Sequence, residues 1–158
     1  MLSLSASFPE VHLAPGEVVV HEGGAGGSIW VLVSGELRVM KGDVAVNSIT
    51  HPGATIGEMA VLLGLDHSAT VETTAPSTLR YVADGAGLLA SDPAVTTLVA
   101  VGLAERLRFV TTYLADLQHQ YGGDAPGLAM ISDVLQQLSQ ATGPRATPGS
   151  AREPDPEY

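Results

Sequence analysis

Residues 56–71 contain residue types that could hold a small anion. Gly57 has no Cβ, so backbone at this position can approach a ligand closely. Residues 58–63 have the pattern of one or two helical turns, whose first backbone N–H groups have no partner within the helix. The N–H groups around Glu58, Met59 and Ala60 therefore point to where an anion would bind.

Two neutral hydrogen-bond donors follow this predicted helix, and an acid begins it. The Ser68 hydroxyl and the Ala69 N–H could each donate to an oxygen of the anion. The Glu58 carboxylate would repel an anion, so we expect it to accept a hydrogen bond from a hydroxyl group, such as that of a sugar. The alternative is that Gly57 and Glu58 only form a turn and an acidic helix start, stabilised by the helix dipole.

The five histidines lack the spacing of a metal site. Metal sites on rolled β-sheets commonly use two His separated by one residue, and the sequence contains no such pair. It also contains no Cys, no Gly-X-Ser-X-Gly elbow, no P-loop and no His-Glu-X-X-His helix. We therefore expect no metal, no cofactor and no catalytic residues.

The elements that would position these groups begin with short β-rich segments. Runs of Val, Ile and Thr between Gly and Pro are typical of a β-sandwich, roll or barrel. Gly35 and the turn at residues 41–43 are expected to be tight hairpin connections. The sequence predicts strands over residues 18–21, 28–34, 36–40, 44–49, 69–74 and 78–82, a mainly β fold.

Two helices are predicted after these strands. Residues 84–90 could form a short helix, and Asp92-Pro93 is typical of the start of a long one over residues 93–121. Apolar residues of the long helix recur at intervals of four and three, which favours packing against another helix, as in a homodimer. The alternative is packing on the chain's own sheets. These residues are Leu103, Leu107, Val110, Leu114, Leu117 and Tyr121.

The rest of the chain is expected to hold little ordered structure. A short helix is predicted over residues 124–140, and residues 141–158, with four prolines and no apolar periodicity, are expected to be a disordered tail. One short helix cannot supply a helix-turn-helix DNA-binding domain, and residues 122–140 contain no Lys or Arg. We therefore expect no DNA-binding domain.

Composition and charge exclude other classes of partner. The 158 residues include 7 Lys+Arg and 17 Asp+Glu, a formal charge of −10, which disfavours nucleic acid and anionic lipid. The N-terminus lacks the basic and apolar regions of a signal peptide, and no uninterrupted apolar stretch approaches membrane-spanning length. We expect a cytoplasmic protein with no membrane partner.

Three segments in order resemble the cyclic nucleotide-binding domain of catabolite activators, protein kinase A regulatory subunits and cyclic nucleotide-gated channels. They are PGEVVVHEG at residues 15–23, SIWVLVSGELRV at 28–39 and IGEMAVLLGLDHSATV at 56–71, which we call the cassette. The resemblance implies a jelly-roll-like β-roll with flanking helices and a long C-terminal helix, over residues 8–121. It also implies cyclic AMP or cyclic GMP as the ligand, with Glu58 on the ribose 2′-hydroxyl.

One position of the cassette departs from that family. Family members that bind nucleotide well have Arg, usually after Pro, where this chain has His67 after Asp66. A guanidinium is always charged and can hold two phosphate oxygens, whereas an imidazole gives one donor and is charged mainly below about pH 6.5. A hydrogen bond to a charged group contributes about 1.5–3 kcal/mol, so we expect binding weakened by tens of fold or more.

Two interpretations of the pocket therefore stay open. In the first, the chain is a stand-alone regulatory module, not an enzyme, that binds a cyclic nucleotide between residues 57–60, residues 67–69 and the long helix. The family's use of helix hydroxyls at the base implies Thr111 and Thr112 there. In the second, the pocket is degenerate, and the domain is a dimerisation or protein-interaction scaffold that binds no nucleotide.

Overall fold

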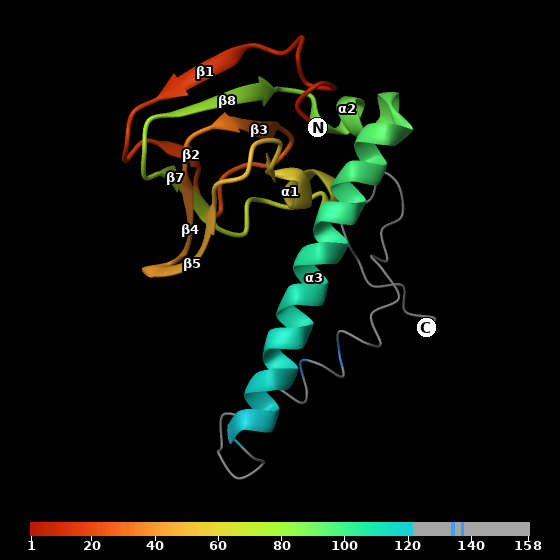
Figure 1. The fold of residues 1–158 in the computed structure, drawn as a ribbon. Coiled ribbons are helices and arrows are strands. Elements are labelled where there is room, and N and C mark those ends of the chain that lie inside the picture. The colour runs from red at the N-terminus through yellow and green to blue at the C-terminus, as the bar shows by residue number, and fades with distance from the viewer. Residues whose placement is uncertain (122–133, 135–136, 138–158) are drawn as a thin grey trace. The chain divides into compact units, whose positions relative to one another are not determined.

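The computed structural model describes residues 1–121, 134 and 137 (Figure 1). The predicted helix at residues 124–140, apart from Val134 and Gln137, and the predicted tail at residues 141–158 lie outside the described residues. The chain divides into two compact units, Met1–Val99 and Ala100–Tyr158. All the strands and the whole cassette belong to the first unit.

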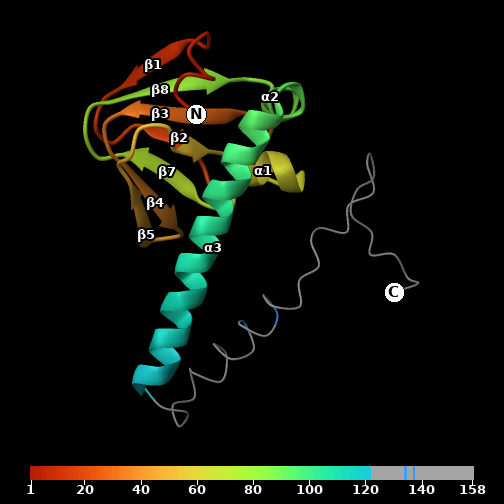
Figure 2. The same cartoon turned by 45° about the vertical axis from the view of Figure 1, so that its right-hand side comes forward.

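The first unit contains two antiparallel sheets of four strands each (Figures 1 and 2). The first sheet has the order β1 (Glu10–Leu13), β8 (Ser77–Val82), β3 (Ile29–Ser34), β6 (Thr55–Ile56). The second has the order β2 (Val18–Val20), β7 (Thr70–Thr73), β4 (Leu37–Lys41), β5 (Val44–Ile49). The fold is thus the mainly β roll that the sequence predicts, with β1 and β6 as two short additions.

Two buried clusters hold the unit together. Leu32, Leu37 and Leu79 have no exposed surface and join residues of both sheets in one cluster. The second cluster joins Ile29 of β3 to Val95 at the start of the long helix. N-terminal residues before the first strand, Phe8 among them, pack on this second cluster. Burial of each such side chain contributes about 1.5–3 kcal/mol, so these clusters fix the frame on which the cassette is built.

The connection at Gly35 is not a hairpin, contrary to the sequence prediction. Strand β3 pairs with β6 and β8, whereas β4 pairs with β5 and β7, so Gly35 carries the chain from one sheet to the other. Its φ of 107° requires glycine, and a Cβ at this position would overlap Ser77. The second predicted turn is a hairpin, because Lys41 and Val44 are paired across β4 and β5.

Three helices complete the described chain: α1 (Glu58–Leu63), α2 (Gly85–Ser91) and α3 (Pro93–Tyr121). Asp84 caps α2 by accepting a hydrogen bond from Gly87 N at 2.8 Å, and Asp92 accepts one from Ala94 N at 2.8 Å at the start of α3. Within the described residues no single helix could cross a membrane. By length and composition only α2 with Pro93–Leu117 passes such a test, across a bend of 111°.

Candidate functional site

Helix α1 is the centre of the cassette and lies between two glycines in the left-handed region. Gly57 precedes it with φ 90°, and Gly64 follows it with φ 61°. A Cβ on Gly57 would lie 2.6 Å from the Ser28 carbonyl oxygen and 3.2 Å from Cε1 of His67. Both the backbone angle and the close approach of Ser28 therefore require glycine, while the approach of a ligand to Gly57 stays a prediction.

The three predicted site residues that follow Gly57 differ in exposure. Glu58 is 2% exposed, Ala60 is buried and the Met59 side chain is 44% exposed. A buried carboxylate needs partners, and Glu58 has an interaction within the protein as well as a place at the helix N-terminus, where the helix dipole favours an acid. Its place next to Gly57 keeps Glu58 a candidate for contact with a ligand.

The imidazole of His67 lies inside the cassette rather than in solvent. Its ring is beside Gly57, and the residue is 8% exposed. The backbone of His67 is fixed from both directions, because its N–H donates to the Gly24 carbonyl at 2.9 Å and its carbonyl accepts from Gly23 N at 2.8 Å. His67 and Glu58 thus flank the same glycine, while Ser68 is exposed and Ala69 half-buried.

The glycine-rich loop at residues 23–27 supports the cassette, a role that sequence reasoning missed. A Cβ on Gly26 would overlap the Leu65 carbonyl and lie 2.9 Å from the Ala60 Cβ. The Gly27 carbonyl of this loop also accepts a hydrogen bond from Gly85 N at 2.8 Å. The run of glycines was the available signal, because such runs mark places where two backbones approach closely.

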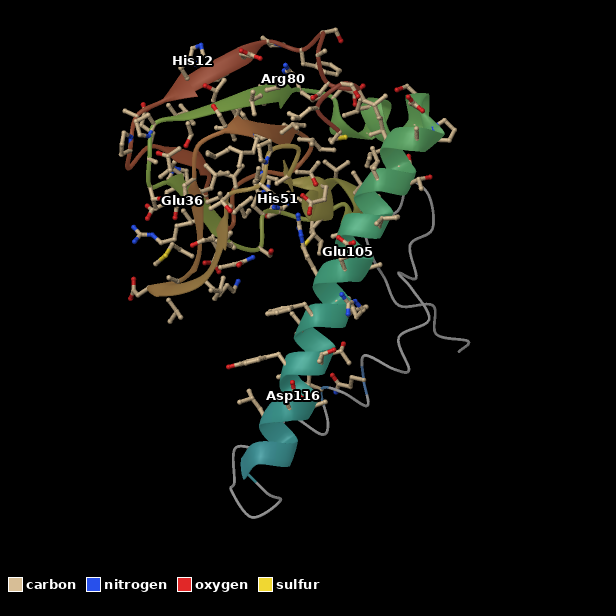
Figure 3. The ribbon with its side chains drawn as sticks, in the orientation of Figure 1. His12, Glu36, His51, Arg80, Glu105 and Asp116 are labelled. Carbon is tan, nitrogen blue, oxygen red and sulfur yellow. The ribbon has the colours of Figure 1, made fainter. Side chains whose placement is uncertain are left out.

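A cation also lies at the cassette, on a residue that the sequence did not single out. Lys41 Nζ donates to the Ser68 carbonyl at 2.6 Å and to Glu22 Oε1 at 2.5 Å. The two arginines nearest in the sequence are engaged elsewhere: Arg38 pairs with Glu72 at 2.5 Å and Arg80 with Glu10 at 3.0 Å (Figure 3 labels Arg80).

Thr111 and Thr112 lie on the exposed part of α3 that belongs to the second unit. The Thr111 hydroxyl donates to the Leu107 carbonyl at 2.8 Å, a bond within the helix that leaves its oxygen able to accept another. Their contact with a nucleotide base stays a prediction.

The first unit also has a cleft that no residue of the cassette lines. An open cleft of about 440 Å³ is lined by residues of β8 and α2 together with Phe8 and Pro9.

In the described part of the chain no three His, Asp or Glu side chains lie close enough together to hold a metal ion. His12 lies in β1 with its Nδ1 2.9 Å from Thr78 Oγ1.

Comparison with known proteins finds related sequences and similar folds. The cAMP-dependent protein kinase regulatory subunit of Yarrowia lipolytica is 32% identical over 77 residues, 49% of this chain and 20% of that protein, so this chain spans about a fifth of its length. The structure described as "Sp-2Cl-cAMPS bound to PKAR CBD2" has a TM-score of 0.55 at 18% identity, over 80% of each chain.

The second similar fold is the structure described as "A cyclic-GMP-dependent signalling pathway regulates bacterial phytopathogenesis". It has a TM-score of 0.58 at 21% identity, over 68% of this chain and 91% of that one. Both structural likenesses concern the fold. The sequence profile of the cyclic nucleotide-binding domain matches residues 10–86, which include the whole cassette. These residues therefore belong to the cyclic nucleotide-binding domain family.

Proposed function

We propose that the cassette binds a cyclic nucleotide, cyclic AMP or cyclic GMP, and that the chain is a regulatory module without catalytic activity. The phosphate would lie against the backbone at the start of α1, His67, Ser68 and the Ala69 N–H. The ribose hydroxyl would donate to Glu58. The relatives' names support this choice of ligand, since they include a cAMP-dependent regulatory subunit.

The observation that carries the proposal is the burial of Glu58 and His67 at one glycine, with Glu58 next to Gly57 in sequence and the His67 ring next to it in space. Both residues are more than nine-tenths buried, and Gly57 cannot be replaced without strain. A buried acid suits a neutral hydroxyl, and a neighbouring imidazole suits an anion, so one small ligand that has both groups fits the pair.

Isothermal titration calorimetry with cyclic AMP and cyclic GMP tests the proposal. We expect measurable binding of at least one nucleotide and a rise in melting temperature, because a ligand at 100 times its Kd stabilises the folded state by about 2.7 kcal/mol. Neither heat nor thermal stabilisation at millimolar concentrations of both nucleotides would contradict it and leave the scaffold interpretation.

The scaffold interpretation is favoured by one observation, the exposed apolar side chains of α3. In the second unit, Leu107 is 50% exposed, Val110 45%, Phe109 71% and Tyr113 55%. Leu107 and Val110 belong to the predicted four-and-three spacing, and such a seam is typical of a helix that pairs with a second copy. We propose that α3 forms a homodimer, with or without nucleotide.

The double variant Leu107→Glu/Val110→Glu should be monomeric in sedimentation equilibrium at concentrations where the natural chain is dimeric, because two acids would face their copies in an apolar seam. Thr112→Glu is the control, since it adds an acid on the helix face that carries Glu105 and Asp116 (Figure 3). A monomeric natural chain, or a dimer that survives the double change, would exclude this interface.

A further inference from the structure

Lys41 makes a contact with the cassette that neither the family's pattern nor the sequence analysis includes. It is the last residue of β4, and its ammonium donates to the Ser68 carbonyl at 2.6 Å. It also forms an ion pair with Glu22, whose second carboxylate oxygen accepts from Gly42 N at 2.9 Å. Glu22 N in turn donates to Thr70 Oγ1 at 2.9 Å, so Lys41 and Glu22 together contact Ser68 and Thr70 of the cassette.

The Ser68 carbonyl belongs to the same peptide unit as the Ala69 N–H. No peptide bond of the described chain is cis, so this carbonyl and this N–H point in opposite directions from one plane. A cation held at the carbonyl oxygen fixes the direction of the N–H. It also draws electron density toward the oxygen, which makes the N–H a stronger hydrogen-bond donor.

We propose that Lys41 is a positioning residue of the phosphate site: it holds the Ser68 carbonyl and thereby aims the Ala69 N–H at the phosphate. This inference rests on the proposed function for its ligand. In this arrangement the cation is separated from the anion by one peptide unit. A family member that binds nucleotide well instead has a guanidinium in direct contact with the phosphate. The charge then acts through the backbone rather than as a direct ligand.

The ion pair that holds Lys41 is intact at neutral pH. The Gly42 N–H, and after it the Lys41 ammonium, hold the pKa of the Glu22 carboxyl below its ordinary value of 4.5, so Glu22 is ionised at pH 7. The Lys41 side chain is 59% exposed and that of Glu22 34%. Because exposed ion pairs contribute little to folding, loss of Lys41 should alter binding more than stability.

The experiment compares Lys41→Met with Arg38→Met at pH 7. Arg38 lies on the same strand and pairs with Glu72, which is outside the cassette, so its removal takes away the same charge and leaves the Ser68 contact in place. We expect Lys41→Met to weaken cyclic nucleotide binding on the order of fivefold and Arg38→Met to leave it nearly unchanged. Lys41→Arg should retain most of the affinity.

A second readout does not need nucleotide binding. In the ligand-free protein, the amide resonance of Ala69 should move upfield in Lys41→Met, since its donor strength falls, and stay in place in Arg38→Met. An equal loss of affinity in both Met variants, or an unmoved Ala69 amide in Lys41→Met, would overturn the proposal. If the natural chain binds no nucleotide, the phosphate role falls with the proposed function, while the amide shift still decides whether Lys41 controls this N–H.

Discussion

Replacing Gly57 with Ala should lower the free energy of unfolding more than any other replacement in the cassette that adds one methyl group. Two costs add at this position. The φ of 90° is unfavourable for a residue with a Cβ, and that Cβ would be 2.6 Å from the Ser28 carbonyl oxygen, which is backbone and cannot move aside. We expect a loss of about 3 kcal/mol in the free energy of unfolding, roughly 10 °C in melting temperature, and no nucleotide binding.

Gly64→Ala is the matched control, because Gly64 bounds the other end of the same helix. Its φ is 61°, yet a Cβ there has nothing within 4 Å, so only the backbone cost applies. We expect a loss of about 1 kcal/mol and nucleotide binding like that of the natural chain. Thermal unfolding and calorimetry on both variants make the comparison. Equal losses for the two would show that the contact of Gly57 with Ser28 is not tight in solution.

Most strands were predictable from sequence because they are apolar runs bounded by turn residues, and β1 and β6 show where that signal stops. Strand β1 is four residues long, alternates between exposed and half-buried positions, and pairs only with β8, so it has no continuous apolar run. Strand β6 has two residues inside a Gly- and Pro-rich segment. Both are strands because β8 and β3 offer them hydrogen-bond partners, a tertiary effect.

The connection at Gly35 shows a second limit. A hairpin and a crossing between two sheets can both need a glycine with positive φ, so the sequence around Gly35 could not distinguish them. The crossing between the sheets is decided by Ser77, 42 positions later in the chain. Ser77 occupies the space that a Cβ on residue 35 would need. Ser77 Oγ also accepts from Glu36 N at 3.2 Å, which fixes the crossing.

The cassette itself was predictable because its residues are close in sequence. Gly57, Glu58 and His67 lie within eleven positions, and their types suffice to suggest an anion site. Lys41 was not predictable, because its contact with Ser68 spans 27 positions, and an exposed Lys at a strand end is ordinary in sequence. The structure thus places the Lys41 ammonium at a cassette that has His67 where nucleotide-binding family members have Arg.

Replacing His67 with Arg is expected to tighten cyclic nucleotide binding by roughly 10- to 100-fold at pH 8. His67 is already beside Gly57, so a guanidinium at this position would reach the phosphate and hold two of its oxygens. A gain of 1.5–3 kcal/mol for a charged hydrogen bond gives that range. Calorimetry with the preferred nucleotide measures it directly.

A second arginine variant separates a direct contact with the phosphate from a general effect of charge. An arginine that contacts the phosphate must lie at residue 67, beside Gly57, whereas a general effect of charge should follow a positive charge placed elsewhere on the first unit. His12→Arg is the control, as it adds the same charge on β1, the edge strand of the first sheet (Figure 3).

Three outcomes are distinguishable. Tighter binding by His67→Arg but not by His12→Arg places residue 67 on the phosphate. Equal gains in the two variants would reduce the effect to net charge, which salt would screen. A His67→Arg variant that folds but binds no nucleotide would contradict the site itself, because the lost guanidinium would then not be what separates this cassette from those that bind.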